Sequence, residues 1–336
     1  MRAQILKQIA PVETMPLESG ELPLPEPGPD QLRVRVLACG VCHTDIHEIE
    51  GDILVPHLPL IPGHEIVGII DKTGPGVNEP APGTLVGIPW LARVCGSCEF
   101  CRRGRENLCI HIQFTGFHTD GGYAEYTLVH HRFCYPLPEN IPVPNLAPLL
   151  CAGVIGYRSL KQAQIQPGDR VGLYGFGASA HLCLQILKHW NCQVAVFTRA
   201  KIHQQHAREL GADWVGTADQ HPPFTLHSGV IFAPAGELVP IALNHLTPGG
   251  TLTLAGIHMS PIPPLAYHLI YHERTLNSVA NSTRQDVREL LELARTIPLR
   301  TTITTFPLAR ANDALIAVKH SRLNGAAVLI NEDDNA

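Results

Sequence analysis

The chain has 336 residues, of which 45% are hydrophobic, and a formal net charge of −5 from 25 basic and 30 acidic side chains. This length suits two domains, and an acidic balance without a basic block gives little support for nucleic-acid or polybasic membrane binding. The first residues lack a secretory signal and no run reaches the ~18 apolar residues of a membrane helix. We therefore expect a cytoplasmic protein that acts on a small molecule, without nucleic-acid or membrane partners.

The first half of the chain alternates short apolar runs with Gly and Pro. Residues 21–30, ELPLPEPGPD, could be a polyproline ligand but are more economically a loop that enters the strand QLRVRVLACG. The runs EIVGIID, TLVGIPW and YAEYTLVH follow, each bounded by turn residues. This pattern predicts a β-rich domain over residues 1–150.

The segment CGVCHTDIHEIEGD, residues 39–52, places thiols, imidazoles, a hydroxyl and acids directly after that strand. Alone it fits a polar turn as well as a reactive site, because a free cysteine often packs as a small hydrophobe. Combined with His64 and Cys151, however, Cys42 supplies the two thiolates and one imidazole of a catalytic zinc site, which keeps its fourth position open. Asp45 is then placed to accept the second ring N–H of His64. Taken singly, Cys151 would be read as a buried core thiol.

The segment CGSCEFCRRGRENLC has the spacing C-x2-C-x2-C-x7-C. Four thiolates close a tetrahedral shell around zinc and leave no position for substrate, so this spacing predicts a structural site. An iron–sulfur cluster is the alternative. The ligands of this site are Cys95, Cys98, Cys101 and Cys109.

From residue 151 to 297 the pattern changes to strand-like runs (RVGLYGF, QVAVFT, GVIFAP, TLTLAGI, TLNSVA) separated by helix-like ones. Strands joined by helical crossovers predict an α/β domain with a doubly wound parallel sheet. The remaining tail reads as strand, helix, strand.

The first strand of this series runs into a G-x-G-x-x-A turn and then into an amphipathic helix. Glycine allows a tight turn and close backbone approach, so that a pyrophosphate can lie at the positive helix N-terminus. The pattern is weak alone and gains strength from its place between strand and helix. The residues assigned to cofactor binding are Gly175, Gly177, Ala178 and Ala180.

These motifs, with GGYAEY and LLCAGV between them, stand in the order found in zinc-dependent alcohol dehydrogenases of the medium-chain dehydrogenase/reductase superfamily. The similarity covers essentially the whole chain and is strongest to the propanol-preferring and cinnamyl-alcohol-dehydrogenase-like branches. It implies a β-rich GroES-like catalytic domain over 1–150, completed by 298–336, and a Rossmann dinucleotide-binding domain over 151–297. It also implies two zinc ions per chain, a small alcohol or carbonyl substrate, and a homodimer or homotetramer.

The resemblance also implies roles for individual residues. Thr44 matches the hydroxyl that contacts the substrate oxygen, and His47 matches the histidine that passes the proton to solvent, although His47 could instead be an ordinary solvated side chain. His43 matches a contact of the cofactor pyrophosphate, and Glu65 matches a carboxylate that approaches the metal during ligand exchange. Ile155 departs from the family pattern, which has a hydroxyl residue near the nicotinamide.

Two rival functions are compatible with parts of the sequence. A zinc-ribbon binding module would use residues 95–109 but would leave the glycine turn and the open ligand set unexplained. A zinc-free quinone or enoyl reductase would share the fold but would not need all three ligands of the open site. The leading prediction is a zinc- and nicotinamide-dependent oxidoreductase that interconverts an alcohol and its aldehyde or ketone; no motif indicates which one.

The second strand of the parallel sheet ends in Thr198 and Arg199, without the carboxylate that usually selects NAD. A hydroxyl and a guanidinium can both donate to a 2′-phosphate, which favours NADP(H). NAD(H) stays possible, because Arg199 could point into water and both cofactors would then be accepted.

Overall fold

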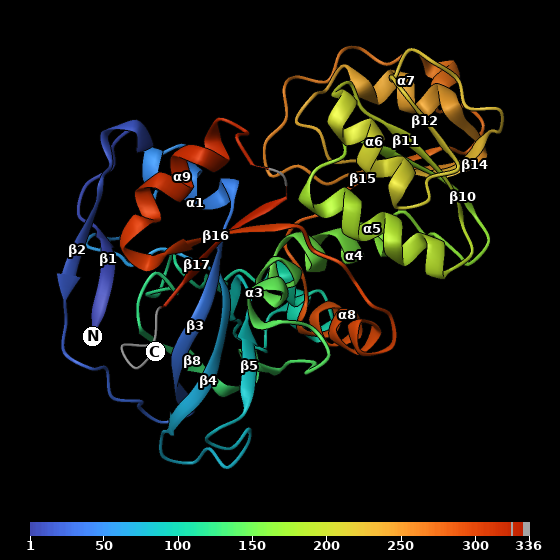
Figure 1. The fold of residues 1–336 in the computed structure, drawn as a ribbon. Helices are drawn as coiled ribbons and strands as arrows, with labels where there is room; N and C mark the ends of the chain where they lie inside the picture. Colours follow the sequence, from blue (N-terminus) through green and yellow to red (C-terminus); the bar gives the residue numbers. More distant parts are fainter. Residues whose placement is uncertain (324, 332–336) are drawn as a thin grey trace. The chain divides into compact units, whose positions relative to one another are not determined.

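The computed structural model describes residues 1–323 and 325–331, which divide into two compact units (Figure 1). The first unit is Met1–Cys151 with Thr283–Ala336, and the second is Ala152–Ser282. None of the helices within the described ranges is long and apolar enough to cross a bilayer.

A seven-stranded sheet forms the centre of the first unit, in the order β16-β17-β3-β4-β5-β9, with β8 also paired to β3. All of its pairs are antiparallel except β16 with β17. Two further two-stranded sheets join β1 to β2 and β6 to β7. The strands are β1 (Arg2–Leu6), β2 (Leu17–Glu21), β3 (Gln31–Val41), β4 (Glu65–Thr73), β5 (Leu85–Ile88), β6 (Leu91–Arg93), β7 (Gln113–Phe114), β8 (Tyr126–His130), β9 (Tyr135–Pro136), β16 (Ile303–Pro307) and β17 (Ala326–Ile330).

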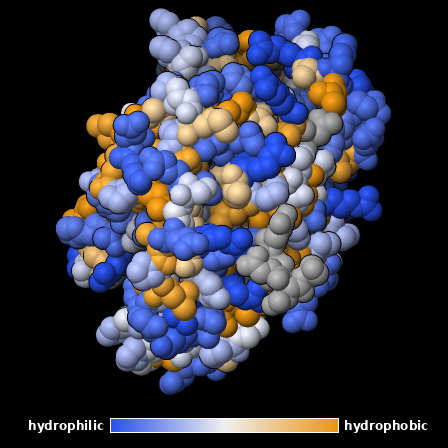
Figure 2. All heavy atoms as spheres, turned by 60° about the vertical axis from the view of Figure 1, so that its left-hand side comes forward, coloured by the Kyte–Doolittle hydropathy of each residue, from blue (hydrophilic) through white to orange (hydrophobic). Residues whose placement is uncertain are grey.

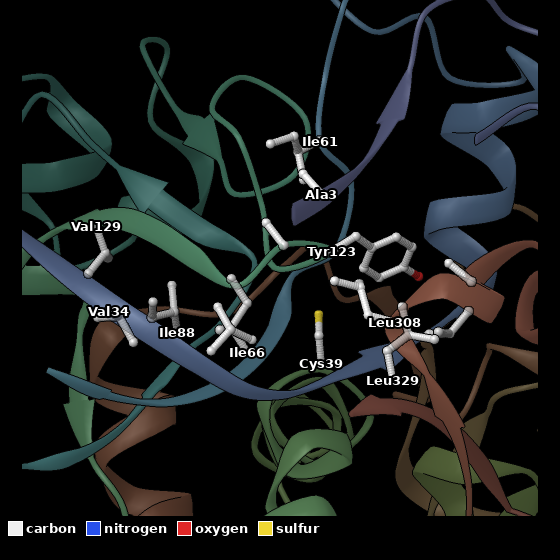
Figure 3. Packing of buried hydrophobic residues seen from close by; sticks show 14 of the residues in the cluster. Ala3, Val34, Cys39, Ile61, Ile66, Ile88, Tyr123, Val129, Leu308 and Leu329 are labelled. Carbon is white, nitrogen blue, oxygen red and sulfur yellow. The ribbon is translucent and has the colours of Figure 1, made fainter. Parts of the chain in front are cut away.

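The helices of the first unit are α1 (His43–Glu50), α2 (Glu99–Arg102), α3 (Val143–Leu146), α8 (Arg284–Thr296) and α9 (Ala311–Lys319). Its core lies between the sheet, the β1–β2 hairpin and α9, as the close-up in Figure 3 shows around Cys39, Ile66 and Tyr123. Strand β3 along its whole length and β4 over its first six residues are buried or half-buried without alternation, so both faces of these strands supply side chains to the interior.

The second unit has a six-stranded parallel sheet in the order β12-β11-β10-β13-β14-β15. In chain order this is 3-2-1-4-5-6, the arrangement of a doubly wound dinucleotide-binding domain. The α/β prediction is therefore confirmed. The elements are α4 (Ala152–Gln162), β10 (Arg170–Tyr174), α5 (Ala178–His189), β11 (Gln193–Phe197), α6 (Lys201–Glu209), β12 (Trp214–Gly216), β13 (Leu226–Ile231), α7 (Leu238–His245), β14 (Leu246–Leu254) and β15 (Thr275–Ser278).

Helix α8 differs from the sequence-based domain assignment. Its periodicity placed it in the domain 151–297, whereas the structure groups everything from Thr283 onward with the first unit. The reason is a set of tertiary hydrogen bonds: Arg284 binds Glu106, and Asn140 donates to the carbonyl of Ala294. An amphipathic helix does not reveal from its sequence which core its apolar face will cover.

The surface seen in Figure 2 is mostly hydrophilic, with hydrophobic residues scattered between hydrophilic ones. Single exposed apolar side chains are normal on folded proteins and indicate no binding site by themselves.

Candidate metal centres and nucleotide-binding turn

The antiparallel pairing of β3 and β4 brings Cys42 and His64 together. Gly40 pairs with Glu65, so the residue that follows β3 and the residue that precedes β4 lie at the same end of the sheet. Cys151 follows the short 3-10 helix Ala147–Leu150. The side chain of Leu150 packs against this sheet at Gly87, where a Cβ would lie 2.7 Å from Leu150 Cδ2.

The ligand atoms of this group have the spacing of a zinc site. The Sγ atoms of Cys42 and Cys151 are 3.9 Å apart, and Cys42 Sγ lies 3.6 Å from His64 Nε2. Tetrahedral zinc with Zn–S bonds of about 2.3 Å separates two sulfur ligands by about 3.8 Å. Glu65 belongs to the same group, whose ligand atoms all lie within 4.8 Å of one another. Two thiols, an imidazole and a carboxylate form a donor set that fits zinc.

Asp45 both caps the N-terminus of helix α1 and orients the imidazole of His64. Its Oδ2 accepts from the backbone N–H of Cys42 at 2.8 Å, which completes a capping box, and its Oδ1 lies 3.0 Å from His64 Nδ1. A histidine that donates from Nδ1 to a carboxylate keeps the Nε2 lone pair for a metal. The Asp45 and His64 side chains are 0% and 1% exposed, so this pair is protected from water.

Electrostatics in the group favour a thiolate. The hydrogen bond from Cys151 and the positive charge that His64 can carry lower the pKa of Cys42 well below its ordinary value, although burial opposes this. Burial and the thiolate of Cys42 raise the pKa of Glu65 well above its ordinary range. Burial alone would lower the pKa of His64, but the negative charge of Asp45 raises it overall. A cation at this position would stabilise every anionic donor around it.

The second cluster contains the four spaced cysteines. Cys95 Sγ lies 3.5 Å from Cys109 Sγ and 4.0 Å from Cys101 Sγ, which also matches tetrahedral zinc. Backbone N–H groups of Ser97 and Cys98 point at Cys95 and lower its pKa to about 5. Helix α2 begins immediately after Cys98, so its turn directs the third sulfur toward the others. All four ligand positions belong to cysteines, and this cluster suits a structural ion.

The residues assigned to proton transfer lie on helix α1. Thr44 donates its backbone N–H to Cys42 Sγ at 3.2 Å, which places it beside the open metal group. His47 is one helical turn further on, and its Nδ1 lies 2.8 Å from Asp52 Oδ2. The Asp52 side chain is 64% exposed, so the His47–Asp52 pair reaches water. His43, assigned to the cofactor, is an exposed residue at the start of the same helix.

The glycine turn has the geometry expected of a dinucleotide site. Gly175 has φ 86°, and a Cβ there would lie 2.9 Å from the backbone N of Ala233, so a larger residue would be strained and crowded. Gly177 is the N-cap of α5, which begins at Ala178. Backbone N–H groups at this N-terminus can therefore bind phosphate. Ala180 is fully buried and lets the helix pack closely.

The two residues that follow β11 differ in their exposure to solvent. Thr198 is 8% exposed, and its carbonyl accepts from Gln204 Nε2 at 2.9 Å. Arg199, the next residue, is exposed. Of the two predicted cofactor contacts, the guanidinium is the more accessible.

An aromatic cluster lies beside the group formed by Cys42, His64 and Cys151, and it was not predicted from the sequence. Trp90 packs edge-on against His64 with ring centroids 4.6 Å apart, and Phe114 stacks on Trp90 at 4.8 Å. Phe117 lies 6.0 Å from Trp90. No spacing rule links these residues to a metal site; the only available signal was the concentration of aromatic residues in WLAR and QFTGFH near the four cysteines.

Two family models match the chain: the alcohol dehydrogenase GroES-like domain over residues 28–139 and the zinc-binding dehydrogenase over residues 180–296. A probable alcohol dehydrogenase, AdhA, of Mycobacterium tuberculosis is 43% identical, covering 98% of this chain and 97% of that protein. An alcohol dehydrogenase of Geobacillus stearothermophilus is 34% identical, covering 98% and 99%. Among solved structures, a cinnamyl alcohol dehydrogenase of Sorghum bicolor superposes with a TM-score of 0.89 at 25% identity, covering 100% and 99% of the two chains.

Proposed function

The chain belongs to the zinc-dependent alcohol dehydrogenases of the medium-chain superfamily, and we propose that Cys42, His64 and Cys151 hold its catalytic zinc. The protein is an oxidoreductase that interconverts an alcohol and its carbonyl compound with a nicotinamide cofactor. The observation that carries the proposed ligand set is the 3.9 and 3.6 Å spacing of its donor atoms, with Asp45 bound to the outer nitrogen of the imidazole. We further propose a structural zinc at the four spaced cysteines, which makes two ions per chain.

Oxidation of an alcohol removes a hydride from carbon and a proton from oxygen. Bound zinc supplies Lewis acidity at the substrate oxygen, and bound nicotinamide takes the hydride with its two electrons. In this proposal Thr44 accepts the hydroxyl proton, and His47 with Asp52 passes it to water, since that pair lies at the exposed side of α1. Asp45 keeps the His64 ring in the metal-binding tautomer. Glu65, whose carboxylate belongs to the same group of ligand atoms, would be the protein ligand that substrate replaces.

The aromatic cluster supports a preference among substrates. Trp90, Phe114 and Phe117 are partly exposed; Trp90 packs against the proposed metal ligand His64, and the two phenylalanines pack against Trp90. Flat rings favour contact with an aromatic or conjugated substrate group, because stacked aromatic pairs gain about 0.5–1.5 kcal/mol beyond their burial. The proposed substrate class is therefore aromatic or allylic alcohols and aldehydes. The name of the sorghum relative, a cinnamyl alcohol dehydrogenase, agrees with this class.

The proposed nicotinamide cofactor is NADP(H). Strand β11 is followed by Thr198 and an exposed Arg199, so no carboxylate would repel a 2′-phosphate. Comparing kcat/KM for NADPH and NADH in the parent and in Arg199→Ala tests this choice. A parent that prefers NADH, or an alanine variant without a selective loss for NADPH, would contradict it and leave the dehydrogenase activity unaffected.

The proposed assembly is a homodimer or homotetramer. Segment 257–271 of the second unit, between β14 and the edge strand β15, supports self-association because it exposes several large apolar side chains: Ile257, Ile262, Tyr267, Ile270 and Tyr271. Light scattering after gel filtration gives the mass, and a monomer at micromolar concentration would exclude both assemblies.

The central experiment combines metal analysis with an aldehyde reduction assay. Carefully purified parent protein should contain two zinc ions per chain and oxidise NADPH in the presence of cinnamaldehyde. The Cys42→Ser variant should contain one zinc ion and lose turnover, since a hard oxygen replaces a soft thiolate at an open site. Full activity with fewer than two zinc ions would exclude the proposed metal content.

A further inference from the structure

The GGYAEY segment lies directly behind the loop that carries His64. The N–H of Gly121 donates to the carbonyl of Ile61 at 2.7 Å, and the N–H of Tyr123 donates to the carbonyl of Pro62 at 3.0 Å. The contact is close because glycines meet there: a Cβ on Gly121 would lie 2.1 Å from the carbonyl oxygen of Gly63. The residue before the proposed metal ligand is thus fixed from behind by this motif.

The ring of Tyr123 fills the space beneath Gly63. A Cβ on Gly63 would lie 2.3 Å from Tyr123 Cδ1 and 2.9 Å from Cys39 Sγ, and the Tyr123 side chain is 0% exposed. Figure 3 shows this ring beside the core, with its hydroxyl oxygen at the end away from the backbone. The negative charge of Asp45 acts on this hydroxyl, whose oxygen has no hydrogen-bond partner within the described residues.

Glu48 is a second buried polar side chain near Asp45. It lies three residues further along α1, which places both carboxyl groups on one side of the helix. Glu48 is 0% exposed, and neither of its side-chain oxygens has a hydrogen-bond partner in the described part of the chain. Burial and the negative charge of Asp45 raise the pKa of Glu48 well above its ordinary value, so the two carboxyl groups lie close enough to interact.

The Tyr123 hydroxyl and the Glu48 carboxyl group therefore both lie buried in the surroundings of the Asp45 carboxylate. A buried polar group without a partner costs free energy, and phenylalanine or leucine would fill the same spaces without that cost. The Asp45 carboxylate acts electrostatically on both groups, and Asp45 also orients His64. Outer partners of this kind change metal affinity by about 10- to 100-fold in zinc proteins.

We propose that Tyr123 and Glu48 are positioning residues of the metal centre, which act through Asp45 on His64. The inference rests on the proposed catalytic zinc site. It assigns a purpose to the GGYAEY motif, whose tyrosine hydroxyl has no structural partner that would explain it.

The test is zinc competition against a chromophoric chelator in Tyr123→Phe, which removes only the hydroxyl. Tyr135→Phe is the matched control, because Tyr135 is also a buried tyrosine of the first unit whose hydroxyl lacks a partner. We expect Tyr123→Phe to weaken zinc binding at the Cys42 group by about 10-fold or more, and to shift the visible bands of the Co2+-substituted protein. Tyr135→Phe should change neither, and the four-cysteine zinc should be retained in both variants.

The proposal would be overturned if Tyr123→Phe had the same zinc affinity and the same Co2+ spectrum as Tyr135→Phe. If Tyr123→Phe does not fold, Glu48→Leu, which removes both carboxyl oxygens, decides by the same competition. Selective loss of zinc from the Cys42 group supports the proposal, and parental affinity overturns it. A parent without a zinc ion that depends on Cys42 would instead overturn the proposed metal centre itself. The two failures are distinguishable, because only the second changes the metal content of the unmodified protein.

Discussion

The ion pair between Glu106 and Arg284 should be a major contributor to the stability of the first unit. Glu106 lies in the four-cysteine segment, and Arg284 is the first residue of α8. The carboxylate accepts from the Arg284 backbone N–H at 2.8 Å, from Nε at 3.0 and 3.1 Å, and from Nη2 at 2.6 Å. The two side chains are 11% and 26% exposed. The pair therefore holds α8 to the metal-binding segment in a largely dry environment.

Glu106→Gln keeps the shape and removes the charge. Breaking a buried pair costs about 3–5 kcal/mol, and we expect the lower end, about 3 kcal/mol, because Arg284 retains some contact with water. For a unit of this size that loss lowers the melting temperature by about 6–12 °C. Urea unfolding and thermal denaturation measure the change. Glu18→Gln is the control: its partner Lys7 and Glu18 itself are 57% and 58% exposed, and the loss should stay below about 1 kcal/mol.

The pH dependence of this effect has a definite sign. Burial alone would raise the pKa of Glu106, but hydrogen bonds and charge from Arg284 lower it overall below the ordinary value of 4.5. The stabilisation is complete above the unfolded pKa and is lost as the pH falls through the lower folded pKa. The difference between parent and Glu106→Gln should therefore shrink in acid. A loss below about 1 kcal/mol at neutral pH, or a difference that grows in acid, would refute this reasoning.

Three further predictions follow from the geometry. Cys98→Ser should lower thermal stability and remove one zinc ion, because the four-cysteine site is structural. Cys42→Ser should abolish turnover and keep NADPH binding, measured by fluorescence. Equal loss of activity without loss of stability in both variants would contradict the division into a structural and a catalytic zinc site. Gly63→Ala should lower the free energy of unfolding, measured by urea titration, by about 1–3 kcal/mol, because φ is 98° and the new Cβ would lie 2.3 Å from the Tyr123 ring. Gly76→Ala is the control: its φ is 83° but the space around it is open, so it should lower the free energy of unfolding by less. Trp90→Ala should raise KM for aromatic aldehydes more than for short aliphatic ones in parallel assays, and an equal rise for both would exclude a stacking role.

The sequence alone was sufficient to predict features whose residues lie close together along the chain. The four cysteines at C-x2-C-x2-C-x7-C fold into one cluster because a short turn is enough to converge them. The G-x-G-x-x-A turn falls between β10 and α5 for a similar reason, since strand, tight turn and helix each have their own pattern. The parallel sheet of the second unit could be predicted because its strands and helices alternate in periods that differ, 2 against 3.6.

Only the tertiary structure determined the geometry of sites whose residues come from distant segments of the chain. Cys42, His64 and Cys151 could be proposed as one group from the family resemblance, but their 3.6–3.9 Å separations arise from the register of β3 with β4 and the packing of the turn before Cys151. The aromatic cluster at Trp90 and the buried carboxyl group of Glu48 could not be predicted from residue spacing, because side chains that meet across a core come from segments with no fixed separation along the chain. Helix α8 illustrates the same reason: its amphipathic pattern determined that one face would be buried, and only the hydrogen bonds to Glu106 and Asn140 group it with the first unit.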